Sequence, residues 1–107
     1  MVNNQKKIAV VALGGNALLP ETQAGTFEEQ QANADTAAEV IVGIVSSGYE
    51  VVLVHGNGPQ VGHVLAQNEE SAAEIPMMPL DVCVAATQGT MGYMLTTAMH
   101  RAMRRLG

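Results

Sequence analysis

Positive charge is scarce in this chain, and that scarcity excludes one large class of partner. The 107 residues contain five Lys and Arg against ten Asp and Glu, which gives a formal net charge of −5. Surfaces that bind nucleic acids depend on clustered Lys and Arg to neutralise phosphates. The few basic residues here lie near the two ends of the chain, so we expect no nucleic-acid partner.

Cysteine, aromatic residues and long hydrophobic runs are scarce as well. Cys83 is the single cysteine, so no internal disulfide can form and a reducing compartment, the cytoplasm, is expected. No stretch approaches the roughly 18 apolar residues that span a bilayer, and the apolar run at 8–13 is too short for a signal peptide. Aromatic residues make up only 3% of a chain that is 48% hydrophobic. We therefore expect one small domain with no membrane segment and a core of aliphatic side chains, Ala and Met.

The apolar pattern predicts an α/β fold. Residues 8–13 and 51–54 are continuously apolar and rich in β-branched side chains, which is typical of parallel strands buried on both faces. Between them, Thr26 followed by Glu29 forms a capping-box pattern that starts a helix, and Gly48 is expected just after its end. The apolar face of this helix is predicted to consist of Ala34, Ala37, Ala38, Ile41, Ile44 and Val45.

Two further helices are expected after the second strand. Pro59 suits the first turn of a helix that runs to about Ser71, because a proline there loses no hydrogen bond. Asp81 is the predicted N-cap of a long helix that runs to about Arg105. This last helix is rich in Met and apolar almost all round, so we expect it to be buried in the core or in a dimer interface.

The strongest internal signal is a repeat at the ends of the two strands. The pattern VVxxxGN occurs at 10–16 and again at 51–57. A strand–helix–strand unit is nearly always right-handed with parallel strands, which puts both Gly-Asn loops at the same edge of the sheet. Ligands of open α/β sheets bind at that edge, outside the carboxyl ends of the strands.

Glycine-rich loops at this edge suit the binding of small anions. Backbone N–H groups that turn toward a ligand form an anion-binding nest, and a helix N-terminus adds its positive dipole. Asn16 and Asn57 are expected either to donate hydrogen bonds or to hold the loops in left-handed backbone geometry. Two such nests facing each other would suit in-line phosphoryl transfer. The alternative is a pair of ordinary tight turns, which favour the same residues. Neither a P-loop nor a dinucleotide fingerprint is present.

Three motifs in order resemble those of carbamate kinases, in the amino acid kinase family. The motifs are VALGGNAL at 11–18, VHGNGPQVG at 54–62, and MPLDVC at 78–83 followed by TQG at 87–89 and MGY at 91–93. The second glycine loop is the most specific of the three, and the resemblance runs from about Lys7 to the end of the chain. Many amino acid kinases carry a lysine two residues before the glycine pair, where this chain has Ala12. Carbamate kinases share that absence, so the departure favours them over acetylglutamate or aspartate kinases.

This resemblance implies a fold, an activity and a site. The fold is a parallel sheet flanked by helices, a truncated three-layer sandwich, with residues 1–107 forming the N-terminal, carbamate- and phosphoryl-binding portion and the nucleotide-binding domain absent. The activity is reversible phosphoryl transfer between ATP and carbamate, which gives ADP and carbamoyl phosphate, commonly in arginine breakdown. The implied cofactor is ATP or ADP with Mg²⁺, bound mainly by the later part, and the implied assembly is a homodimer. The implied catalytic residues are Gly14, Gly15 and Asn16, which hold the phosphoryl group, and the implied substrate-binding residues are Gly56, Asn57 and Gly58.

The chain alone is expected to be inactive. Phosphoryl transfer needs cations, and Lys7 lies on the order of 20 Å from the first loop along an extended strand. The C-terminal arginines lie on the order of 30 Å along the last helix from Asp81. Two other classes of function therefore stay open: a non-catalytic anion- or nucleotide-binding module, and a dimerisation fragment built on the Met-rich helix. Within the kinase class, aspartate- or glutamate-type substrates are the nearest competitors.

The remaining candidate side chains have plainer interpretations. His55 adjoins the second glycine loop and is expected to bond to nearby backbone rather than to substrate. His63 and His100 have no partner at metal-ligand spacing, so no metal site is expected. Cys83 is expected to be a small buried hydrophobe rather than a nucleophile.

Overall fold

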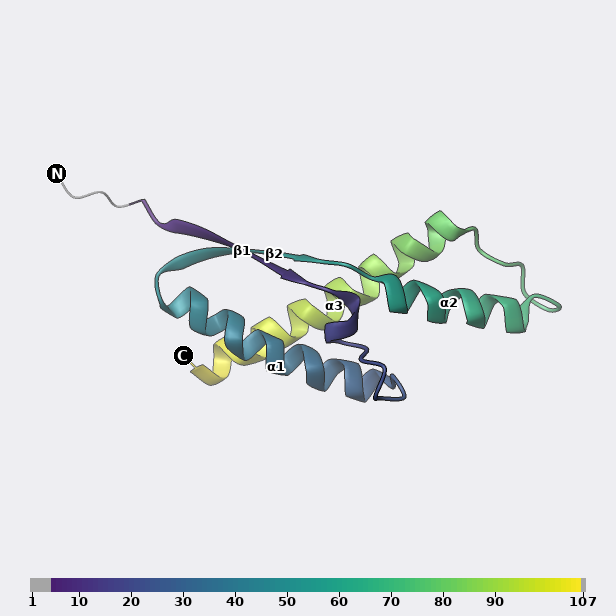
Figure 1. Ribbon diagram of the computed structural model, residues 1–107, viewed down its shortest axis with the longest axis horizontal. Helices are drawn as coiled ribbons and strands as arrows, with labels where there is room; N and C mark the ends of the chain where they lie inside the picture. Colours follow the sequence, from purple (N-terminus) through teal and green to yellow (C-terminus); the bar gives the residue numbers. More distant parts are fainter. Residues whose placement is uncertain (1–4, 107) are drawn as a thin grey trace.

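The computed structural model describes residues 5–106, so the two ends of the predicted unit 1–107 lie outside the described residues. The elements alternate as expected for an α/β fold (Figure 1). In chain order they are β1 (Lys7–Leu13), the 3₁₀ turn η1 (Gly15–Ala17), α1 (Phe27–Ser46), β2 (Tyr49–His55), α2 (Gly58–Ser71) and α3 (Leu80–Leu106). The predicted order of strands and helices is therefore confirmed.

The two strands form a parallel pair joined by the crossover helix α1. Their register pairs Lys7 with Tyr49 and Leu13 with His55, so the strands end side by side. Leu13 and Leu53 pack against the core formed by the helices, whereas every second residue of each strand is exposed. The expectation that both strand faces are buried is therefore wrong. In Figure 1 both strands lie to one side of α1 and α3, and no described helix covers their other side.

Helix α1 begins and ends where the sequence predicts. The Thr26 hydroxyl accepts a hydrogen bond from the Glu29 N–H, and the Glu29 carboxylate accepts one from the Thr26 N–H, which completes the capping box. Gly48 follows the helix with φ +101°, a left-handed conformation that glycine adopts without steric cost. The buried face is Ala34, Ala38, Ile41 and Val42, so Val42 replaces the expected Val45, which is exposed.

Helices α2 and α3 run close to the predicted bounds, with one correction. Pro59 lies in the first turn of α2, as predicted. Helix α3 starts at Leu80, so Asp81 is an acidic residue of the first turn, where it favours the helix dipole, and is not the N-cap. Among the described residues, no helix combines the length and the hydropathy that crossing a membrane requires.

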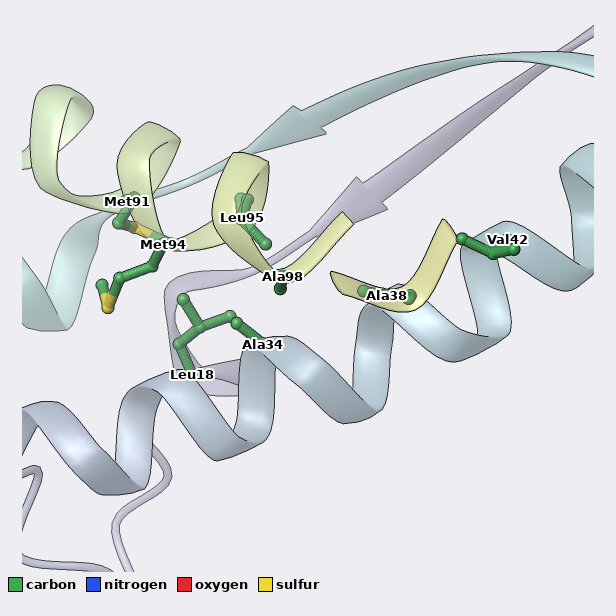
Figure 2. Close-up of a cluster of buried hydrophobic side chains, with 9 residues drawn as sticks. Leu18, Ala34, Ala38, Val42, Met91, Met94, Leu95 and Ala98 are labelled. Carbon is green, nitrogen blue, oxygen red and sulfur yellow. The ribbon is translucent and has the colours of Figure 1, made fainter. Parts of the chain in front are cut away.

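The core lies between α1 and α3 and includes one residue from the first glycine loop. Figure 2 shows Leu18, which directly follows η1, against the facing sides of the two helices. Leu18 is fully buried, and its carbonyl accepts a hydrogen bond of 3.0 Å from the Asn33 side chain. The cluster comprises Leu18, Ala34, Ala38, Val42, Met91, Met94, Leu95, Ala98 and Ala102. The core therefore anchors the first glycine loop as well as the two long helices.

Candidate functional site

The two Gly-Asn loops lie next to each other at the carboxyl edge of the sheet. Leu13 and His55, the last residues of the two strands, are paired in the register. Immediately beyond them, the Gly56 N–H donates a hydrogen bond of 2.9 Å to the Leu13 carbonyl. The juxtaposition expected from the strand–helix–strand pattern is therefore present in the structure.

Gln60 fastens the second loop to the first. It lies in the first turn of α2, and only 5% of its surface is exposed. Its side-chain Nε2 donates a hydrogen bond of 2.9 Å to the carbonyl of Gly15, 45 residues away in the chain. Sequence reasoning missed this contact, although a polar residue in a helical turn next to a glycine loop is a signal that could have indicated it.

Gly15 is the loop glycine that the surrounding structure requires. A Cβ at this position would lie 2.5 Å from Oε1 of Gln60 and 2.6 Å from Cδ of Pro59. It would also lie 3.3 Å from the backbone nitrogen of Gly58, which shows how closely the N-terminus of α2 approaches the first loop. By contrast, a Cβ at Gly14 or Gly58 would meet nothing within 4 Å. Close approach, and not a left-handed backbone, is therefore the reason for glycine here.

Asn57 uses its side-chain amide to hold the loop against α3. Its Nδ2 donates to Oγ1 of Thr87 at 2.7 Å and to the carbonyl of Val84 at 3.1 Å. The Thr87 hydroxyl is itself buried and lies within hydrogen-bonding distance of two carbonyls of its own helix, Cys83 and Val84. This clamp was not predicted from the sequence, because its two ends lie 30 residues apart.

The idea that the asparagines hold left-handed backbone is wrong. Asn57 has φ −147°, and no residue other than glycine has a positive φ among the described residues. Asn16 belongs to η1 and is exposed. Of the two expected roles for Asn57, donation and backbone geometry, the structure shows donation, directed at α3.

Backbone N–H groups at the two loops are the donors that stay free. In the described chain, no hydrogen bond uses the N–H of Gly15 or Asn16 in the first loop, nor that of Gly58 or Gln60 at the start of α2. The N-terminus of η1 and that of α2 also lack any side-chain cap. A cluster of uncapped N–H groups at two helical N-termini favours a small anion.

The basic side chains lie away from these loops. Lys7 starts β1, at the end of the strand opposite to the loops. Arg101 binds Asp35 at 2.7 Å, and Arg105 binds Glu39 at 2.8 Å, so both pairs tie the end of α3 to α1. These pairs are largely exposed and contribute little to stability. The loops therefore supply hydrogen-bond donors without a cationic side chain.

The other candidate side chains are engaged locally. Nδ1 of His55 lies 3.2 Å from the carbonyl of Gly56, as expected for a histidine that bonds to nearby backbone. Cys83 is fully buried, and its Sγ lies 3.7 Å from the carbonyl of Met78, as expected for a buried hydrophobe. Within residues 5–106 no group of three or more His, Cys, Asp or Glu side chains could hold a metal ion.

A cavity of about 650 Å³ lies behind the loops, between α1, α2 and α3. Gln60 and Thr87, the two side chains that hold the loops, form part of its wall. No Lys, Arg, Asp or Glu lines it, so it does not match the chemistry of a charged phosphate. The anion-binding chemistry therefore belongs to the exposed edge of the loops and not to this cavity.

Comparison with known proteins places these loops in a family. The model of the amino acid kinase family matches residues 7–106. This chain belongs to the amino acid kinase family. Carbamate kinases are among its similar relatives: that of Trichomonas vaginalis is 50% identical over 99 residues, which cover 92% of this chain and 32% of that protein. That of Pyrococcus horikoshii is 45% identical over 100 residues, with 92% and 32% covered.

Solved carbamate kinases share the fold of this family member. The structure of the Giardia lamblia carbamate kinase bound to AMP-PNP superposes with a TM-score of 0.88 at 44% identity, over 95% of this chain and 35% of that chain. The α/β fold with a carbamate-kinase-like parallel sheet is therefore confirmed. The chain spans about a third of the length of these relatives.

Proposed function

We propose that this chain is the carbamate- and phosphoryl-binding part of a carbamate kinase, which transfers phosphate reversibly between ATP and carbamate. The convergence of two amide-rich loops at one sheet edge is the observation that carries the proposal. Gly14, Gly15 and Asn16 would hold the transferring phosphoryl group through backbone amides. Gly56, Asn57 and Gly58 would hold carbamate, with Asn57 acting through its backbone, because its side chain is bound to α3.

The chemistry of the loops fits an anion better than it fits a metal. Mg²⁺ takes oxygen ligands, whereas the loops present N–H groups. Gly14 and Gly58 leave open space where side chains would stand, so a phosphoryl or carbamate oxygen can approach the backbone there. We therefore assign ATP, ADP and Mg²⁺ mainly to the remaining two thirds of such an enzyme.

Transfer itself needs positive charge that this chain does not bring to the loops. A developing negative charge on the phosphoryl oxygens requires Lys, Arg or a metal ion close by. Within the described chain, Arg101 and Arg105 are paired with α1, and Lys7 lies at the far end of β1. We expect the 107-residue chain alone to form no ATP from ADP and carbamoyl phosphate. Turnover by the purified chain would refute this expectation.

Anion binding by the loops can be tested without catalysis. We expect calorimetric titration to detect phosphate and carbamoyl phosphate binding to the chain, and Gly56→Val to abolish it. A side chain at Gly56 meets only the nitrogen of Gly15, at 3.9 Å, so the variant fills the ligand space while the fold persists. Gly43→Val, in equally open surroundings on α1, is the matched control and should bind normally. Binding that survives in Gly56→Val would contradict the proposed site.

A second candidate role is homodimerisation through α3. Tyr93 is exposed on this helix, and Gly89 and Gly92 leave open space beside it, which would allow another helix to approach closely. Sedimentation analysis of the chain tests this role: a dimer that Tyr93→Asp disperses would support it, and a monomer would count against it. In a cell, we propose a cytoplasmic enzyme of arginine breakdown, which growth of a deletion strain on arginine would test.

A further inference from the structure

The sheet has one face that is covered and one that is not. Its covered face packs on the helical core through residues such as Leu13 and Leu53. On the opposite face, the exposed fractions are 65% for Ile8, 68% for Val10, 49% for Val52 and 45% for Val54. Parallel strands are found almost only in sheets that are covered on both faces, so this arrangement lacks one layer.

The exposed side chains form one continuous apolar surface, which we call the bare sheet face: Ile8, Val10, Ala12, Val52 and Val54. The register pairs Val10 with Val52 and Ala12 with Val54, so their side chains stand side by side on neighbouring strands. Glu50, the partner of Ile8, is the charged residue on this face and lies at the end remote from the loops. A contiguous apolar patch of this kind marks a surface for another polypeptide.

The overall shape indicates the same missing layer. The radius of gyration is 16.8 Å, whereas a compact domain of about 100 residues has a value of about 13 Å. The longest dimension, 67 Å, is more than twice each of the other two, 25 and 21 Å. Such an open shape leaves apolar surface without a partner inside the chain.

The comparisons indicate what covers the bare sheet face. This chain keeps the fold of the solved carbamate kinases yet spans only about a third of their length. We propose that the bare sheet face binds a helical layer carried by the remaining two thirds of a carbamate kinase fold. The face ends at Ala12, two residues before the first glycine of the loops, so this layer would lie next to them. It could then bring cations to the loops, a consequence that rests on the proposed function.

The test is the assembly of two separate polypeptides. The 107-residue chain, carrying an affinity tag, is co-expressed with the part of the Giardia lamblia carbamate kinase that this chain does not match. We expect the two to co-purify as a one-to-one complex. Failure to form a complex, while both polypeptides are present in the soluble fraction, would overturn the proposal; if the partner is insoluble alone, its rescue into solution by the tagged chain is the supporting result and its persistent insolubility the opposing one.

A matched pair of variants locates the contact. Val10→Glu places a charge on the bare sheet face, whereas Val40→Glu places it on α1 at nearly the same exposure, 65% against 68%. Because burial of one valine and desolvation of the new charge are both lost to binding, Val10→Glu should weaken the complex at least tenfold. Val40→Glu should change the affinity less than threefold. Equal effects of the two variants would overturn the proposal, and circular dichroism of each variant confirms that the chain is folded.

Two further outcomes are separable. If the chain alone forms a dimer that Val10→Glu disperses, a second copy covers the bare sheet face and the proposal is wrong. ATP formation from carbamoyl phosphate and ADP, measured on the complex, tests the proposed function independently. A stable complex without this activity would support the docking surface and count against the kinase, whereas absence of a complex would overturn the docking surface alone.

Discussion

Replacing Gly15 by alanine tests most sharply how the two glycine loops are held together. The new Cβ would stand 2.5 Å from Oε1 of Gln60, where ordinary van der Waals contact begins at about 3.4 Å, so it would intrude by about 0.9 Å. It would also stand 2.6 Å from Cδ of Pro59, which is fixed in the first turn of α2. The Gln60 side chain can move away only by giving up its hydrogen bond to the Gly15 carbonyl.

The expected loss of stability follows from these two effects. Overpacking of a tight site costs about 1–3 kcal/mol, and a buried hydrogen bond contributes about 1 kcal/mol. Together they lower the free energy of unfolding by about 2–3 kcal/mol. For a chain of this size, that corresponds to a decrease of roughly 10–20 °C in Tm. Urea titration and thermal melts, each followed by circular dichroism, measure both quantities.

Gly14→Ala is the control for this prediction. Gly14 precedes Gly15 in the same loop, has φ −73° and ψ 158°, and leaves open space where a Cβ would stand. Alanine adopts this extended conformation without strain, so stability should be unchanged or higher by up to about 1 kcal/mol. Equal destabilisation by both variants would refute the reasoning, because the loss would then come from glycine content and not from contact with Gln60 and Pro59.

Three further predictions concern the elements around the loops. Thr87→Val should cost about 1–2 kcal/mol in urea titration, because it removes the buried acceptor of the Asn57 amide; Thr36→Val, an exposed threonine, is its control, and equal costs would contradict the clamp. Leu18→Ala should cost about 2–5 kcal/mol by the same measurement, since the side chain is fully buried, and a cost below 1 kcal/mol would contradict its anchoring role. The backbone N–H of Thr26 holds the pKa of Glu29 below its ordinary value, so this contribution to stability is present above the unfolded pKa and is lost as pH falls through the folded one. Melts from pH 6 to pH 3 should therefore show a steeper decrease in Tm for the native chain than for Glu29→Gln, and parallel curves would contradict the capping box.

Local signals in the sequence predicted most of the architecture. The period of the apolar residues gave the strands and helices, Thr26 and Glu29 gave the start of α1, and Gly48 gave its end. Each of these signals acts within a few residues, so it carries its own physical cause. The parallel pairing followed from the single crossover helix, because chirality leaves few other arrangements.

The failures have one shared cause, which is dependence on distant residues. An apolar strand reads the same whether one face or both are covered, and the cover of the second face is not among the described elements. The direction of the Asn57 side chain depends on Thr87, and the need for glycine at position 15 depends on Gln60. These partners lie 30 and 45 residues away, so the loop motif identified where a site lies without revealing which atoms hold it together.

The most direct test of the account is a map of amide chemical shifts during titration of the ¹⁵N-labelled chain with phosphate and with carbamoyl phosphate. The account predicts saturable shifts at the N–H groups of Gly15, Asn16, Gly58 and Gln60, with little change along the body of α3. Shifts confined to the arginines near the end of α3, or no saturable shift at either loop, would contradict the claim that the two loops form one anion-binding site.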